Sequence, residues 1–257
     1  MLIQKQNEEI NALEDWFRLA PPQGGKKHWV DGRSAKETAK AWLAGLPQEI
    51  QALLAQHSDF RNVAFDTVEP EALIPFDKHG NPRHADLAIL AHDEYGEIAI
   101  TVEAKADEAF DFLVSSKFSQ ALEYAIANPR SQAVDRIHDL ALSLFSKGLK
   151  GEAKITSLRY QLLTSVAGTL AFATEHGIDR AVLIIHEFIT SETSERKLQR
   201  NLVDLTKFYR RITHQKDTQI ASGELYGPIP VPGKPLFESG IEFYIGKAVR
   251  HIGTPMP

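Results

Sequence analysis

The 257-residue sequence contains no cysteine, which excludes disulfide bonds and thiolate metal sites. Its longest apolar runs fall well short of the roughly 20 residues that a membrane-spanning helix needs. The polar residues 1–9 also lack the basic and apolar regions of a secretory signal. We therefore expect a protein of a reducing, cytoplasmic compartment that has no membrane partner.

The sequence also lacks an excess of basic residues, because 29 Lys and Arg stand against 34 Asp and Glu, for a net charge of −5. This balance counts against a protein that coats DNA through a globally basic surface, since sequence-independent affinity comes from cationic contacts to phosphates. Basic residues gather locally in residues 25–28, in residues 77–84, and in residues 196–200 together with Lys207, Arg210 and Arg211. The middle segment is either a phosphate-contacting loop or a solvated turn rich in Gly, Asn and Pro.

Motifs for nucleotide-driven and serine chemistry are absent as well. The sequence has no G-x-x-x-x-G-K-[ST] loop, no G-x-G-x-x-G opening a helix, and no G-x-S-x-G turn. A motor, a dinucleotide-binding module and a serine hydrolase are therefore not indicated. With 43% hydrophobic and 25% charged residues, the chain has the composition of an ordinary globular protein.

The most informative stretch is a predicted hairpin of residues 83–92 and 97–105, joined by a turn at residues 93–96. Centring the hairpin on this turn places Asp86 opposite Glu103 and Ala88 opposite Thr101. Since side chains alternate along strands, one face is wholly apolar and comprises Leu87, Ile89, Ala91, Ile98, Ile100, Val102 and Ala104. The other face gathers Asp86, Glu103 and Lys105 away from the turn. A slip of one residue would mix the two faces, so the apolar pattern supports this register.

Asp86 and Glu103 are expected to face each other closely. Directly opposed residues have β-carbons about 4.5–5.5 Å apart, and two carboxylates at that distance repel unless a proton or cation lies between them. Oxygen ligands favour a hard ion such as Mg²⁺, for which Mn²⁺ can substitute. With Lys105 on the same face, the arrangement indicates phosphodiester chemistry. The alternative is a surface sheet edge at which Lys105 forms an ordinary ion pair with Asp86.

These residues resemble the motif of the PD-(D/E)XK nuclease superfamily, an acidic residue on one core strand followed by (D/E)-x-K on the next. The matching positions are Asp86 and Glu103-Ala104-Lys105, and the motif's proline is replaced by Ala85. Over residues 62–190 the resemblance implies a restriction-endonuclease-like α/β core, a mixed sheet flanked by helices. It also implies that Asp86, Glu103 and the carbonyl of Ala104 ligate the metal, while Lys105 positions water and stabilises charge.

Two further carboxylates and two basic side chains lie close to this motif in the sequence. Glu69 or Glu71 could supply a third carboxylate from the preceding strand, although charge and proline there also suit a protected edge strand. Arg83 and His84 lead directly into Asp86 and are candidates for substrate binding.

Arg159 and Gln161 open the helix that follows the hairpin, where the resemblance implies a polar residue that orients phosphate or water. A helix N-terminus also favours anions through its free amides. The alternative for both residues is the ordinary polarity of a helix start. His186 and Glu187, at the end of an apolar strand, are expected to be polar groups with satisfied partners.

The remaining pattern predicts helices and strands in an α/β order. Expected helices cover residues 10–19, 34–44 (opened by the capping box of Ser34 and Glu37), 47–56, much of 110–149 with a break at 128–129, 157–176 and 194–213. Expected strands cover residues 62–74 and 241–249 and the buried segment 181–189, while residues 227–235 are proline-rich and extended. We divide the chain into an N-terminal helical extension (1–60), the core (61–215) and a C-terminal extension (216–257), packed as one compact domain.

The function expected from these features is metal-dependent hydrolysis of phosphodiester bonds, most simply in DNA. Two alternatives stay open. The first is a non-catalytic member of the fold that binds nucleic acid or protein, and the second is a nuclease subunit of a larger restriction or defence assembly. A homodimer and a larger assembly are both compatible with the sequence.

Overall fold

The computed structural model describes residues 1–149, 151, 153–191, 193–238 and 240–253, and a mixed β-sheet forms its centre. The described strands lie in the order β2-β1-β3-β4-β5-β6-β8-β7. Their bounds are β1 Leu2–Lys5, β2 Glu8–Glu9, β3 Ala64–Ile74, β4 Arg83–Asp93, β5 Gly96–Lys105, β6 Arg180–Ile189, β7 Leu225–Ile229 and β8 Glu242–His251. This is the mixed α/β architecture that the sequence predicts.

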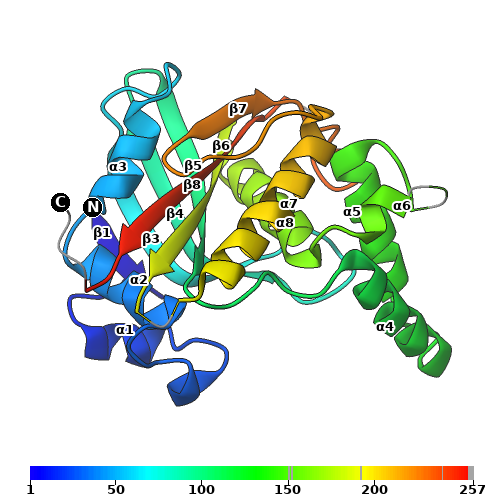
Figure 1. The fold of residues 1–257 in the computed structure, drawn as a ribbon, viewed down its shortest axis with the longest axis horizontal. Helices are drawn as coiled ribbons and strands as arrows, with labels where there is room; N and C mark the ends of the chain where they lie inside the picture. The colour runs from blue at the N-terminus through cyan, green and yellow to red at the C-terminus, as the bar shows by residue number, and fades with distance from the viewer. Residues whose placement is uncertain (150, 152, 192, 239, 254–257) are drawn as a thin grey trace.

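Helices cover both faces of the sheet and give the molecule three layers (Figure 1). The described helices are α1 Leu13–Leu19, the short 3₁₀ helix Gly25–Lys27, α2 Ser34–Leu43, α3 Gln48–Ala55, α4 Val114–Ala127, α5 Ala133–Phe145, α6 Ala153–Thr156, α7 Tyr160–His176 and α8 Glu195–Thr213. One core lies between the sheet and α1–α3. The other lies between the sheet and α5, α7 and α8. No helix of the described residues is long and apolar enough to cross a membrane.

The predicted hairpin register is confirmed. Strands β4 and β5 pair from Leu87–Val102 to Asp93–Gly96. All seven residues predicted for the apolar face belong to the core under α1–α3. On the opposite face Ala88 and Ala99 are buried in the other core, and helix α7 packs across β4, β5 and β6. Glu103, at the end of the hairpin away from the turn, therefore lies beneath α7, whose Gln161 and Ser165 donate to it.

Strand β6 runs parallel to β5 after a long crossover through α4, α5, α6 and α7. Nine of its ten residues are buried, as expected of a parallel strand covered on both faces. Gly177 ends α7 with φ +69°, a left-handed conformation that glycine adopts without steric cost. The predicted order of three strands, helix and strand is confirmed. The predicted break between two helices is also confirmed, because α4 ends at Ala127 and α5 begins at Ala133.

The two predicted extensions both contribute to the central sheet. Strand β1 pairs in parallel with β3, so residues 1–60 are not purely helical. Strand β1 is not predicted from the sequence, because it has only four residues, two of them polar, and only Ile3 is buried. Strand β8 pairs along its whole length with β6, and β7 borders β8. Residues 239 and 254–257 of the predicted C-terminal extension lie outside the described residues.

The predicted capping box at the start of α2 is wrong. Arg33 occupies the cap position and its side chain makes no capping bond. The hydroxyl of Ser34 instead donates to the Glu108 carboxylate, and Glu37 Oε1 accepts from the backbone N–H of Gly32 at 2.8 Å. A tertiary contact therefore uses the hydroxyl that a local motif was expected to use. Helix α1 also starts at Leu13 rather than at the predicted Ile10.

Candidate active site

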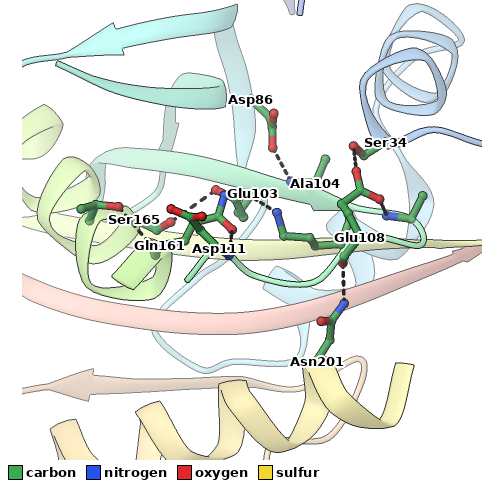
Figure 2. A network of polar contacts seen from close by, with 12 residues as sticks. Ser34, Asp86, Glu103, Ala104, Glu108, Asp111, Gln161, Ser165 and Asn201 are labelled. Atoms are coloured by element: carbon green, nitrogen blue, oxygen red, sulfur yellow. Dashed lines mark hydrogen bonds and ion pairs between the residues drawn. The ribbon is translucent and has the colours of Figure 1, made fainter. Parts of the chain in front are cut away.

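Asp86, Glu103 and Lys105 lie at the end of the hairpin away from its turn. The ladder between β4 and β5 ends at Leu87–Val102, so Asp86 and Glu103 follow directly beyond the last pair. Glu103 and Lys105 are only 3% and 4% exposed, respectively, and Asp86 is partly buried. Figure 2 shows Asp86 and Glu103 close to Ala104, with residues of α7 approaching Glu103.

Glu103 is surrounded by donors. Lys105 Nζ donates to Glu103 Oε1 at 2.6 Å and Gln161 Nε2 donates to the same oxygen at 2.7 Å. The Arg83 guanidinium and the Ser165 hydroxyl donate to Oε2. Burial alone would raise the pKa of Glu103, but the positive charges of Lys105 and Arg83 outweigh it and keep the pKa below its usual value. Lys105 thus forms its ion pair with Glu103. The alternative of a surface sheet edge predicted an ion pair with Asp86 instead.

The carboxylate of Asp86 has far fewer hydrogen-bond donors around it than that of Glu103. Among the described residues its carboxylate accepts one hydrogen bond, from the backbone N–H of Ala104 to Oδ2 at 2.7 Å. Burial and the neighbouring charge of Glu103 raise the pKa of Asp86 to about 7. A carboxylate in this position needs a proton or a cation when it ionises.

Glu71 provides a third carboxylate next to Asp86. It lies on β3 between the Pro70–Leu87 and Ala72–Ala85 pairs, and hence beside Asp86. Burial and the charge of Asp86 raise the pKa of Glu71 to about 8. Its backbone has φ +47°, a strained conformation for a residue with a side chain, and such strain is concentrated at functional sites.

The structure separates Glu71 from the other predicted carboxylate on β3. Glu69 has a side chain that is 49% exposed and pairs with Lys5 at 2.7 Å. It is not among the residues that line the cavities around Asp86. Glu69 therefore forms an ion pair outside the cavities, whereas Glu71 belongs to the candidate site. The edge-strand alternative is wrong, because β3 lies between β1 and β4 in the sheet.

The four predicted substrate-binding residues have different environments. Gln161 reaches Glu103, but Arg159 does not, because its Nε donates to Asp204 at 2.7 Å and its Nη1 to the carbonyl of Asp111 at 3.1 Å. Arg83 lines both cavities beside the candidate site, yet its Nη2 donates to Glu103 and to Ser165 Oγ, the latter at 2.8 Å.

His84 also lines both cavities, and its Nδ1 lies 3.9 Å from Glu71 Oε2. Burial and the charge of Arg83 lower the pKa of His84, so its imidazole favours the neutral form. Farther along the sheet, His186 pairs with Glu49 at 2.8 Å and Glu187 with Lys247 at 2.7 Å. Both strand-end residues therefore have the partners expected of them, although one oxygen of Glu187 and Nδ1 of His186 make no hydrogen bond within the described part of the chain.

Two connected hollows open over these side chains. The smaller one, about 300 Å³, is lined by Glu71, Asp86, Glu103 and Ala104 together with the loop that precedes α2. The larger one, about 660 Å³, extends toward α4 and α5 and is lined by Lys117 and Arg136. They share Gln23, Arg83, His84, Lys105, Glu108 and Gln161 as lining residues. We refer to the two hollows together as the cleft.

Sequence reasoning missed Ser165 and Glu108. Gln161, Ser165 and Thr169 follow one another at intervals of four residues along α7, and Thr169 Oγ1 lies 2.5 Å from Thr101 Oγ1. A polar stripe on a buried, mostly apolar helix was the available signal for Ser165. Glu108 accepts from Ser34 and from the N–H groups of Ala106 and Asp107 (Figure 2). It had no sequence signal, because the side chain that donates to it, Ser34, comes from a distant segment.

The donor set suits a hard divalent cation. Asp86 and Glu71 offer carboxylates whose pKa values are raised by burial and by a neighbouring carboxylate, Glu103 for Asp86 and Asp86 for Glu71. Oxygen ligands are those that Mg²⁺ prefers. Within the described residues, no three His, Cys, Asp or Glu side chains lie close enough together to hold a metal ion by themselves. An ion beside Asp86 would therefore need water or substrate oxygens to complete its coordination, as is usual for Mg²⁺.

Comparisons with known proteins give one family. No curated protein and no solved structure matches the chain. Residues 9–251 match a family described as a domain of unknown function, DUF6946. This match covers nearly the whole chain and all the residues of the candidate site. The chain therefore belongs to the DUF6946 family.

Proposed function

We propose that this protein is a metal-dependent nuclease that hydrolyses phosphodiester bonds in DNA. The observation that carries the proposal is the partly buried, under-compensated Asp86 beside Glu103 and Lys105 in an open cleft. Perturbed carboxylates in a cleft mark functional sites more often than structural ones. The register that brings them together also matches the PD-(D/E)XK motif, which supports a restriction-endonuclease-like core.

In this proposal Asp86, Glu103 and the carbonyl of Ala104 hold a Mg²⁺ or Mn²⁺ ion. When bound, the ion supplies Lewis-acid polarisation of a phosphate and lowers the pKa of a water molecule. Asp86 is the better ligand, because among the described residues its carboxylate is engaged by a single backbone N–H. At least one of the side chains that now donate to Glu103 must move away before Glu103 can contribute an oxygen to the ion. Glu71 can hold a proton at neutral pH, because burial and the charge of Asp86 raise its pKa to about 8.

Lys105 places a positive charge beside the reacting phosphate. Its ammonium is held by Glu103 at 2.6 Å and lies 5.3 Å from the centre of the Phe110 ring. A fixed, buried cation stabilises negative charge that develops on the phosphate oxygens more strongly than a solvated one. Gln161 has a neutral amide on the same cleft wall and can orient the attacking water. Arg83 fixes Glu103 and brings further positive charge to the cleft.

The test is cleavage of supercoiled plasmid DNA in Mg²⁺ or Mn²⁺ by the wild type and by Asp86→Asn, Glu103→Gln and Lys105→Ala. If the three residues act as one unit, each change removes most of the rate, and a double change costs little more than a single one. Glu69→Gln is the matched control, because it removes a carboxylate from the same region of the sheet but outside the cleft. A wild type that cleaves neither DNA nor RNA with several divalent ions would refute the catalytic proposal.

A non-catalytic DNA-binding protein is the second candidate. It is favoured by one observation, that both oxygens of Glu103 already accept from protein side chains. Such a protein would bind DNA equally well with Ca²⁺ and with a chelator, and Asp86→Asn would leave that binding unchanged. A nuclease would instead bind DNA more tightly with Ca²⁺, and this gain would be lost in Asp86→Asn. Activity that appears only with a partner protein would indicate a subunit of a larger assembly.

A further inference from the structure

A second cavity, of about 400 Å³, lies between α6 and the C-terminal half of α8 and is separate from the cleft. Six of its lining residues are basic or histidine: Lys154, Lys207, Arg210, Arg211, His214 and Lys216. No described residue that lines it is acidic. We call it the basic pocket. In a chain with a net charge of −5, so many cations around one hollow call for a physical explanation.

Helix electrostatics explains only part of this concentration of charge. Arg210 and Arg211 lie in the last turn of α8, where cations complement the negative end of the helix dipole. Arg210 Nε also donates to the carbonyl of Thr218 at 2.7 Å and holds the following loop. Lys154 and Lys216 come from α6 and from the loop after α8, so the dipole of α8 does not account for them.

The lysines of the basic pocket are exposed and uncompensated. Lys154, Lys207 and Lys216 are each exposed, and none forms an ion pair within the part of the chain that the structure describes. Three ammonium groups that have no ion pair within the described residues repel one another, and an anion would relieve that repulsion. The described lining contains no Phe, Tyr or Trp side chain that could stack on a base. This composition suits phosphate groups and not a nucleoside.

The basic pocket and the cleft lie on either side of one short segment. Ser157 and Leu158 line the pocket, whereas Tyr160 and Gln161 line the cleft. Three residues of fully extended chain span at most about 11 Å, so Leu158 and Gln161 are no farther apart than that. About 10 Å of a B-DNA axis carries about six phosphates. A duplex that lies in the cleft and continues past Leu158 would therefore bring several phosphates within reach of the pocket.

We propose that the basic pocket binds the phosphate backbone of the DNA substrate beyond the cleft, as an anchor that does not take part in the chemistry. This inference rests on the proposed function for the identity of the anion. It adds a binding segment at the α6–α8 surface and a requirement for substrate length. A DNA fragment too short to reach the pocket is bound only by the cleft.

The test uses the double variant Lys154→Glu/Lys207→Glu. Both side chains are exposed, and neither makes a hydrogen bond or ion pair that the fold needs within the described chain. The double variant Arg130→Glu/Lys234→Glu is the matched control, because both of these side chains are exposed and line neither the basic pocket nor the cleft. Binding of a labelled 30-base-pair duplex is followed by fluorescence anisotropy in Ca²⁺ at several salt concentrations.

Counterion release sets the expected size of the effect. Each lost phosphate contact reduces the slope of log affinity against log salt by about 0.9. At about 0.1 M salt this loss weakens the affinity about eightfold. Loss of two contacts should therefore weaken binding by about 60-fold and reduce the slope by about 1.8. The control should keep the affinity of the wild type to within a small factor. Equal affinities and slopes for the two double variants would overturn the inference.

Inorganic tripolyphosphate tests the pocket without the cleft. Titration calorimetry should detect its binding to the wild type and to Asp86→Asn, and a much weaker binding to Lys154→Glu/Lys207→Glu. If the pocket variant loses DNA binding but the wild type cleaves no DNA, the anchor stands and the nuclease proposal fails. If tripolyphosphate binds the pocket but DNA does not bind the wild type, DNA as the occupant is refuted. If the pocket variant binds both ligands as the wild type does, the inference itself is wrong.

Discussion

Replacement of Asp86 by Asn should stabilise the metal-free protein at neutral and alkaline pH. Burial and the charge of Glu103 raise the pKa of Asp86 from 3.8 to about 7 in the folded protein. A carboxyl whose folded pKa is raised favours its neutral form, so the folded state loses stability as the pH rises from about 4 to about 7. Asn carries no charge at any pH and does not impose this penalty. The stability difference between variant and wild type should therefore grow over that interval and stay constant above it.

The magnitude follows from the size of the shift. Three pKa units correspond to about 4 kcal/mol, which is an upper bound because Asp86 is partly exposed. We expect a gain in the free energy of unfolding of about 1–4 kcal/mol at pH 8 and almost none at pH 4. For a chain of this size, each kcal/mol raises the melting temperature by about 2–4 °C.

The assay is urea denaturation of both proteins from pH 4 to pH 8 with a chelator, repeated at pH 8 with Mg²⁺ or Mn²⁺. Divalent metal at 100 times its dissociation constant should stabilise the wild type by about 2.7 kcal/mol and should not stabilise Asp86→Asn. Glu69→Gln serves as the control and should follow the wild type, since exposed ion pairs contribute about 1 kcal/mol or less. Parallel pH profiles for wild type and Asp86→Asn, or equal stabilisation of both by metal, would refute the reasoning.

Two other predictions concern the scaffold. Burial opposes the ionisation of Glu49, but hydrogen bonds from His186 and Arg250 outweigh it and lower the pKa of Glu49 to about 2. Glu49→Gln should therefore lower the free energy of unfolding by about 1–3 kcal/mol at pH 7. Acid denaturation should show this difference vanishing as the pH falls from about 4.5 to 2. Asp204 and Arg159 form an ion pair whose side chains are 8% and 11% exposed, respectively, so Asp204→Ala should lower the free energy of unfolding by about 3–5 kcal/mol, measured by thermal melting. Its metal-induced stabilisation should match that of the wild type at a temperature where the variant is folded; loss of that stabilisation would place this pair in the metal site.

The sequence by itself determined the parts of this protein that local periodicity governs. The register of β4 and β5 followed from alternation, because one wrong step would have buried charges and exposed Ile98, Ile100 and Val102. The buried strand β6 followed from its continuous apolar run, and the end of α7 followed from Gly177. The same alternation predicted that Asp86, Glu103 and Lys105 gather at the end of the hairpin away from its turn.

Only the tertiary structure decided how the charges are partnered. Lys105 pairs with Glu103 and not with Asp86, and Arg159 turns away from the cleft to Asp204. Strand alternation specifies the face on which a side chain lies, but not which of several neighbours it contacts. Ser165 and Arg83 come from segments 62 and 20 residues away from Glu103, respectively, and such distances in sequence carry no periodic signal. The basic pocket likewise exists only because α6, α8 and the loop that follows α8 are packed together.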